Sequence, residues 1–166
     1  MGNSSRSDTR WSEFFCNTFS ARIMLFVGDR KEMIASVAGA FGELKSLMGD
    51  EMTKEFVKKI RLYCGSKISG ADGECISVTA SSGAKLWIVR VDDFDGSVDG
   101  VATLSHECLH AALSVLDCCG VSENPPFECL CYLHGAIFKK FLIGASAHIG
   151  LLRKHSQMKH QTRKDM

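Results

Sequence analysis

The segment Val101–Cys119 constrains the fold more than any other part of this sequence. It is long and mostly apolar, and Gly120 follows it in the position where a glycine commonly ends a helix. The segment therefore predicts a helix, and within it lies His106-Glu107-Cys108-Leu109-His110. Because residues four apart lie on one face of a helix, both imidazoles are expected on the same side, one turn apart. Two histidines at this spacing are typical of a pair of metal ligands.

Glu107 lies about 100° around the helix from His106, so its carboxylate can reach a water on a metal held by the histidines without being a ligand. A catalytic zinc site needs a third protein ligand and one open position for water. The favoured third ligand is Glu128, in the first turn of the next predicted helix. The turn from Gly120 to Pro126 is expected to fold that helix back beside the histidine helix, which brings facing residues close together.

Several cysteines surround this motif. Cys129, Cys131 and His134 lie near Glu128 in the sequence, but only Cys131 shares a helical face with Glu128, which makes it the next candidate for the third ligand. A second metal site built from cysteines is disfavoured because no C-x-x-C pair occurs. Free cysteines are commonly small buried hydrophobic residues, and that interpretation is preferred here.

The remaining elements are predicted from periodicity and turn residues. Arg22–Val27 is expected to form a buried strand, and Asp29 with Glu32 forms a capping box before a helix that begins near Arg30. The other expected elements are a helix to about Leu47, a helix Glu51–Tyr63, a strand pair Cys75–Ala80 and Leu86–Val91, and a helix from about Pro126 to Leu142. Their order predicts an α+β fold with a small mixed sheet and backing helices.

Length and charge limit the domain organisation and the partners. The 166 residues suit one domain at 13–152, with a flexible N-terminal tail at 1–12 and a basic tail at 153–166. The net charge is +1, of which the basic tail carries +4 and residues 1–152 carry −3. This balance argues against a dedicated nucleic-acid binder, and the tail lacks the aromatic residues that stack on bases.

Hydropathy and cysteine content indicate the compartment. The longest apolar runs are interrupted well before the roughly 20 residues that cross a bilayer, so no membrane helix is expected. The chain has eight cysteines, and its first residues lead into no apolar signal segment. A reducing cytoplasm is therefore the expected location. The acidic turn Asp92–Asp99 departs from the spacing of a calcium-binding loop, and a solvated turn is preferred.

Two segments resemble a known family. The order of strand, H-E-x-x-H helix and glutamate-bearing helix is similar to that of the gluzincin metallopeptidases. More narrowly, 105–112 (SHECLHAA) and 128–135 (ECLCYLHG) resemble small metallopeptidases encoded by phages and prophages. The resemblance covers about residues 86–142. The sequence departs from the gluzincin pattern in having cysteines at 129 and 131 and in lacking the Asp or Ser pair that follows the family's glutamate.

The resemblance implies a minimal zincin-like domain that hydrolyses peptide bonds. It implies a Zn²⁺ ion on His106, His110 and Glu128, with Glu107 as the general base. Tyr132 or His134 would donate a hydrogen bond to the developing oxyanion, and Tyr132 could instead support a histidine ligand. The strand Leu86–Val91 would offer an exposed edge to an extended peptide.

Two alternatives accompany this interpretation. One is a metal-binding phage accessory protein that binds a host protein without proteolysis, in the host cytoplasm, through the basic tail or the acidic loop. The other is a regulatory protease with a single repressor-like target, for which generic substrates would fail even with an intact site.

Overall fold

A mixed four-stranded sheet is the centre of the fold. The computed structural model describes residues 10–39, 42, 45–46, 49–65, 72–79, 83, 85–121 and 127–162. The strands are β1 (Trp11–Cys16), β2 (Ala21–Val27), β3 (Gly73–Thr79) and β4 (Lys85–Val91), and the helices are α1 (Arg30–Gly39), α3 (Asp50–Gly65), α4 (Val98–Cys118) and α5 (Phe127–Thr162). The strand order is β1-β2-β4-β3. The β2–β4 pair is parallel, and the two outer pairs are antiparallel.

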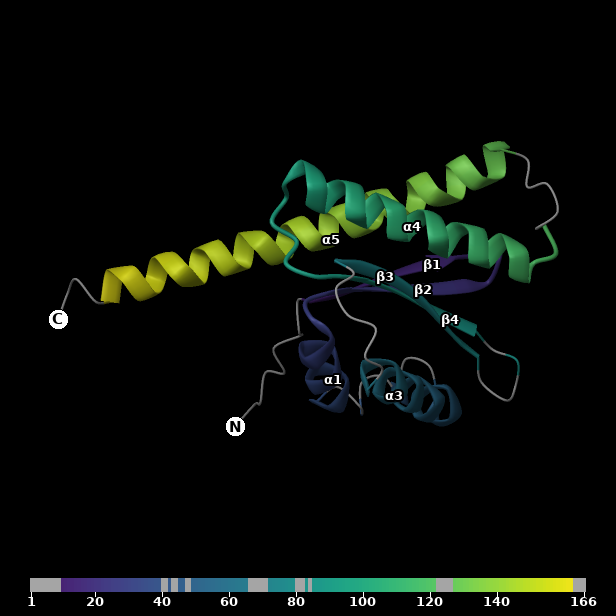
Figure 1. The fold of residues 1–166 in the computed structure, drawn as a ribbon, viewed down its shortest axis with the longest axis horizontal. Helices are drawn as coiled ribbons and strands as arrows, with labels where there is room; N and C mark the ends of the chain where they lie inside the picture. The colour runs from purple at the N-terminus through teal and green to yellow at the C-terminus, as the bar shows by residue number, and fades with distance from the viewer. Residues whose placement is uncertain are drawn as a thin grey trace.

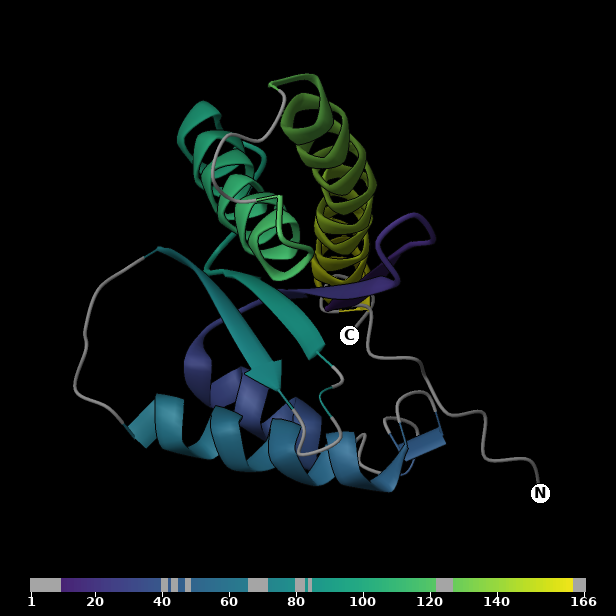
Figure 2. The ribbon, with the colours of Figure 1, turned by 90° about the vertical axis from the view of Figure 1, so that its right-hand side faces the viewer.

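Helices cover both faces of this sheet. Helices α1 and α3 lie on one side, and α4 and α5 lie on the other (Figures 1 and 2). Because side chains alternate along a strand, Leu86 and Ile88 of β4 pack towards α1 and α3, whereas Trp87 and Val89 pack towards α4 and α5. The sheet thus separates two hydrophobic clusters, and this arrangement confirms the small α+β fold.

Several predicted elements are confirmed with close boundaries. Strand β2, helix α3 and the β3–β4 pair match the predicted segments to within two residues at each end. The capping box is also formed: the backbone N–H of Asp29 donates to Glu32 Oε2 at 3.0 Å, and the N–H of Glu32 donates to Asp29 Oδ1 at 2.7 Å. The part of the first predicted helix beyond Gly39 lies largely outside the described residues.

Three boundaries differ from the prediction. Strand β1 begins at Trp11, inside the segment predicted as a tail, and pairs in full with β2. Helix α4 begins at Val98, three residues early, because Ser97 accepts a hydrogen bond from the N–H of Gly100 at 3.1 Å and caps the helix. Helix α5 continues to Thr162, twenty residues past its predicted end and through most of the predicted basic tail, because no proline follows Pro126.

The prediction that Leu86–Val91 is an edge strand is wrong. Strand β4 pairs with β2 on one side and with β3 on the other, so its backbone is hydrogen-bonded along both edges. The parallel pairing with β2 is the physical reason, because it places β4 inside the sheet. The edge strand on this side is β3, and it lies beside α4.

Helix α5 crosses β1 at a glycine. A Cβ atom built on Gly144 would lie 2.1 Å from the side-chain oxygen of Ser12, so any larger residue would push the helix away from the sheet. No described helix combines the length and the hydropathy of a membrane-spanning segment.

Candidate metal centre

Helix α4 carries the predicted histidines and is fixed against the sheet by its apolar face. Leu104, Cys108, Ala111 and Val115 are fully buried in the cluster between the sheet and α4 with α5. The indole N–H of Trp87 on β4 also donates to Ser114 Oγ at 2.8 Å. With this face inside, the side of α4 that bears His106 and His110 is turned to solvent.

His106 and His110 converge, as their spacing predicts. Their Nε2 atoms are 3.0 Å apart, and their rings meet edge to face with centroids at 4.6 Å. Two nitrogen ligands on one tetrahedral zinc ion lie about 3.3 Å apart, given Zn–N bonds of about 2.0–2.1 Å. The pair therefore fits two positions of one coordination sphere with little adjustment.

Glu107 points the other way, into the contact between α4 and the edge strand β3. It is only 8% exposed, and a Cβ atom on Gly73 of β3 would lie 2.8 Å from Glu107 Cγ. Burial raises the pKa of this carboxyl, and positive charge on His110 or His106 acts in the opposite direction. Glu107 thus retains its proton to higher pH than an exposed glutamate does.

One half-buried thiol and one buried thiol lie near Glu107. Burial, together with the nearby Glu107 carboxylate, raises the pKa of Cys75 on β3 to about 12. Burial and the neighbouring Cys75 raise the pKa of Cys108 as well. Both therefore stay protonated at neutral pH. The prediction that the cysteines near the motif are buried packing residues is confirmed for Cys108, whereas Cys118, Cys119 and Cys131 are exposed.

Glu128 and Tyr132 do not lie with the histidines. Glu128, Cys129 and Tyr132 line a groove of about 420 Å³ between the start of α5 and the β1 hairpin, together with Phe14 and Phe19. Glu128 is exposed, and Tyr132 is 77% exposed. The groove faces β1, at the opposite edge of the sheet from β3.

His134 marks the side of α4 that α5 covers. Its Nε2 atom lies 3.1 Å from the backbone oxygen and 3.3 Å from the hydroxyl of Ser105. His110 is five residues after Ser105, which turns it about 140° around the helix. The α4–α5 contact and the histidine pair therefore occupy different sides of α4, and α5 cannot present Glu128, Cys131 or His134 to the pair in this arrangement.

The fit to a catalytic zinc ion is consequently partial. Within the described ranges, which include all the predicted ligands, no group of three His, Cys, Asp or Glu side chains is arranged to hold a metal ion. The two histidines converge as predicted, whereas the adjacent Glu107 is buried against β3. Glu128 and Tyr132 are not brought to them.

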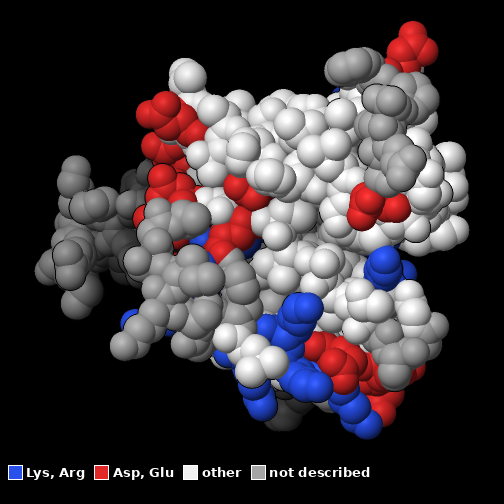
Figure 3. Space-filling view, turned by 45° about the vertical axis from the view of Figure 1, so that its right-hand side comes forward, with Lys and Arg blue, Asp and Glu red and all other residues white. Residues whose placement is uncertain are grey.

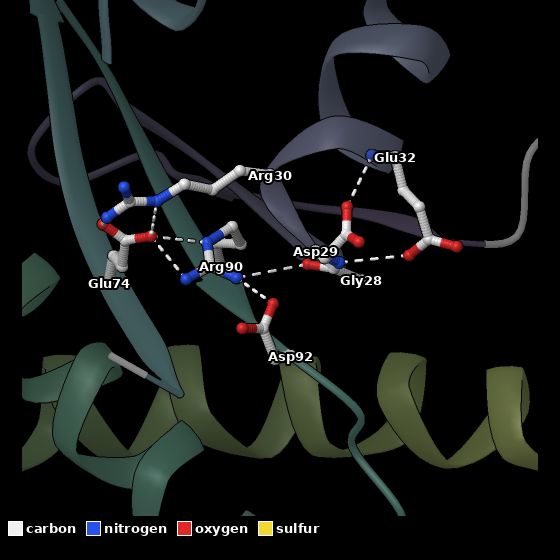
Figure 4. Close-up of polar contacts among 7 residues, drawn as sticks. All are labelled: Gly28, Asp29, Arg30, Glu32, Glu74, Arg90 and Asp92. Atoms are coloured by element: carbon white, nitrogen blue, oxygen red, sulfur yellow. Dashed lines mark hydrogen bonds and ion pairs between the residues drawn. The ribbon is translucent and has the colours of Figure 1, made fainter. Parts of the chain in front are cut away.

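Sequence reasoning missed one buried polar network, which Figure 4 shows. Arg90 on β4 is 1% exposed; it donates to Glu74 Oε1 at 2.7 Å and to the backbone oxygen of Gly28 at 3.3 Å, and it forms an ion pair with Asp92. Arg30 at the start of α1 donates two further bonds to Glu74, at 2.8 and 2.9 Å. An arginine in an otherwise apolar strand was the signal that could have revealed this network.

The acidic turn after β4 lines a pocket. Asp92, Asp93, Asp95 and Asp99 surround a space of about 420 Å³ together with Asp29 and Glu32 from the start of α1. The side chain of Asp95 accepts from the N–H of Ser97 at 2.7 Å, which orders the turn before α4. Asp93, Asp95 and Asp99 are exposed, as expected of a solvated turn, and the turn also forms one wall of this pocket.

Comparison with protein-family models, with curated proteins and with solved structures gives no match to this chain.

Proposed function

We propose that this protein is a zinc-dependent metallopeptidase whose reaction centre is the side of α4 next to strand β3. The observation that carries the proposal is the convergence of His106 and His110, whose Nε2 atoms lie 3.0 Å apart, on the stretch of α4 that also carries Glu107. Two imidazole nitrogens are ligands that zinc prefers, and a neighbouring glutamate is the usual proton carrier of such sites.

Each residue has a separate task. His106 and His110 would hold the ion on the solvent side of α4. A bound zinc ion supplies a water of lowered pKa and polarises a carbonyl oxygen. Glu107 takes a proton and returns it to the leaving amine, a role that its partly buried carboxyl suits because a raised pKa brings proton affinity closer to neutral pH. The seven cysteines whose side chains are described are free thiols, which suits a reducing compartment such as the cytoplasm.

Zinc content tests the ligand set. Wild-type protein and the variants His110→Ala, Glu107→Gln and Glu128→Ala are purified identically without chelator, with His134→Ala as a control histidine that contacts Ser105 instead. The proposal expects zinc in the wild type, its loss in His110→Ala, and its retention in Glu107→Gln and His134→Ala. Absence of zinc from the wild type, or zinc retained without His110, contradicts the proposal.

Cleavage tests the reaction. The zinc-loaded wild type is incubated with a mixed peptide library, and new termini are identified by mass spectrometry. Glu107→Gln should keep zinc and lose cleavage, because the amide cannot carry the proton. Equal cleavage by the wild type and Glu107→Gln would assign the activity to a contaminant or to another site.

A second candidate function is metal binding without proteolysis, in a protein that binds another protein. The position of Glu128, in the groove against β1 and away from the histidines, favours it, because a catalytic site needs a third protein ligand. Zinc bound by the wild type and by Glu128→Ala alike, with no peptide cleaved from the library, would support this candidate over the peptidase.

A further inference from the structure

The histidine pair supplies half of a tetrahedral coordination sphere. Zinc bound in a structural site has four protein ligands, and His106 and His110 provide two. Among the residues that the structure describes, no third His, Cys, Asp or Glu joins them. Both imidazoles are exposed, so ligands from another molecule could reach an ion that they hold.

Helix α4 itself carries no exposed formal charge between Asp99 and Asp117. Between Asp99 and Asp117 the only Asp, Glu, Lys or Arg is Glu107, which is buried. Leu109 is 36% exposed and Leu113 is 40% exposed on the same side of the helix. In Figure 3, Lys and Arg gather over the α1 and α3 layer, and the upper layer shows a broad white surface with Asp and Glu at its left and right sides.

The exposed residues follow the spacing of a helix-pairing seam. Ala102, His106, Leu109 and Leu113 are separated by four, three and four residues, which is the a/d pattern of two packed helices. A solvent-facing side of a helix in a monomer normally carries charged residues, whereas this side offers small, apolar and imidazole groups. We call Ala102, His106, Leu109, His110 and Leu113 the α4 seam.

We infer that a zinc ion joins two copies of this chain through their α4 seams, with His106 and His110 of each copy as its four ligands. The inference rests on the zinc binding by these histidines that is proposed above. A second copy of the chain would supply the two missing zinc ligands, because it carries two imidazoles at the same spacing. In a two-fold symmetric contact the same patch faces itself, so the two pairs meet on the axis and no exposed charge within the seam opposes its copy.

A joint site would regulate the proposed peptidase. Four protein ligands leave no open position for water, and closed sites of this kind are structural rather than catalytic. The zinc-linked dimer is then an inactive form, and hydrolysis belongs to the separated chains. Leu109 and Leu113 would be covered in the dimer and exposed on dissociation.

Sedimentation velocity with parallel zinc analysis tests the joint site on the full chain. As zinc is added, the wild type should change from monomer to dimer, with saturation at one zinc per two chains. His106→Ala and His110→Ala should remain monomeric. Leu109→Glu should weaken the dimer at least tenfold, because the added carboxylates face each other across the axis. Leu62→Glu is the matched control, since Leu62 is 66% exposed on α3 and should leave the dimer unchanged.

The outcomes separate this inference from the function that it rests on. A monomer that binds one zinc per chain and loses it in Glu128→Ala overturns the joint site and keeps the peptidase. A chain that binds no zinc overturns both. A dimer that forms without zinc, or that survives His106→Ala, also overturns the joint site. Circular dichroism of each variant confirms that a loss of the dimer is not a loss of fold.

Discussion

Arg90 and Glu74 form a buried ion pair across the β3–β4 strand pair, in which Arg90 Nε donates to Glu74 Oε1 at 2.7 Å. Glu74 accepts from Arg30 as well, so one carboxylate joins the edge strand, the inner strand and the start of α1. Arg90 and Arg30 therefore hold the edge strand β3 from the face of the sheet that α1 covers, whereas α4 packs on the other face. Stability and site geometry depend on the same residues.

Replacement of Arg90 by Met should lower the free energy of unfolding by about 3–5 kcal/mol, because it leaves Asp92 without its arginine partner and Glu74 with Arg30 alone. Urea denaturation measures the change. Arg22→Met is the control, since its ion pair with Glu13 is far more exposed, with side chains 29% and 38% exposed, and a surface pair is worth about 0–1 kcal/mol. If Arg90→Met and Arg22→Met lowered the free energy of unfolding equally, the Arg90 network would stabilise the fold no more than a surface ion pair does.

Replacement of Gly73 by Ala should destabilise the protein by about 1–3 kcal/mol, through overpacking at the β3–α4 contact. The added methyl would lie 2.6 Å from Thr103 Cγ2 and 2.8 Å from Glu107 Cγ, so α4 must move. Gly135→Ala provides the contrast: no atom lies within 4 Å of its added methyl, and a helical alanine should stabilise by about 0.5–1 kcal/mol. A neutral Gly73→Ala variant would contradict the close packing at this contact.

Asp92→Asn should become more stable relative to the wild type as pH rises from 4 to 6.5. Burial raises the pKa of Asp92, with Arg90 opposing. A carboxyl with a raised folded-state pKa contributes stability at low pH, and that contribution is lost as pH rises through the folded pKa. The neutral amide avoids the loss. Urea denaturation at both pH values gives the difference.

Asp50→Asn should show the opposite trend. Hydrogen bonds from Lys54 and Lys45 lower the pKa of Asp50, so its contribution is present above the unfolded pKa and absent in acid. The asparagine variant should therefore lose stability relative to the wild type as pH rises. If Asp92→Asn and Asp50→Asn changed stability with pH in the same direction, burial would not dominate at Asp92 or the lysine contacts would not dominate at Asp50.

Thiol reactivity should separate the cysteines by burial. Iodoacetamide at pH 8 should modify the exposed Cys118, Cys119 and Cys131 and spare Cys75 and Cys108, as mapped by mass spectrometry. Lys85 Nζ lies 2.9 Å from Cys118 Sγ, and the hydrogen bond to Cys118 raises the pKa of Lys85. Lys85→Met should slow alkylation of Cys118 and leave Cys131 unchanged. Rapid labelling of Cys108 in the folded protein would contradict its burial.

Local sequence signals predicted most of the elements. The capping box at Asp29 and Glu32 fixed the start of α1, and the i, i+4 spacing of His106 and His110 predicted their convergence, because both depend only on neighbours within one helical turn. Strand β1 was missed because its sequence, WSEFFC, carries polar residues at the second and third positions and belongs to an outer strand. Pairing with β2 orders it, and that pairing is not visible locally.

The position of Glu128 could not be obtained in the same way. The short connection correctly predicted that α5 returns along α4. The side of α5 that faces α4 depends on how both helices pack on the sheet, and a shift of one residue turns a helix by about 100°. Here Leu133, Ile137 and Phe141 pack inward, which leaves Glu128 towards β1. That rotation is decided by tertiary packing.

The strand order has a consequence for how the chain reaches this structure. The β1–β2 and β3–β4 pairs each join neighbouring strands, whereas the parallel pairing of Arg22 with Leu86 closes a loop of 64 residues. Loop closure costs conformational entropy before any contact is gained. The β1–β2 and β3–β4 hairpins are therefore expected to form early, and the parallel β2–β4 pairing between them late. Within the sheet, the main contacts of helix α4 are with β3 and β4. The helix can therefore dock on the β3–β4 hairpin before the parallel β2–β4 pairing forms. The histidine-bearing unit would then assemble ahead of the rest of the protein.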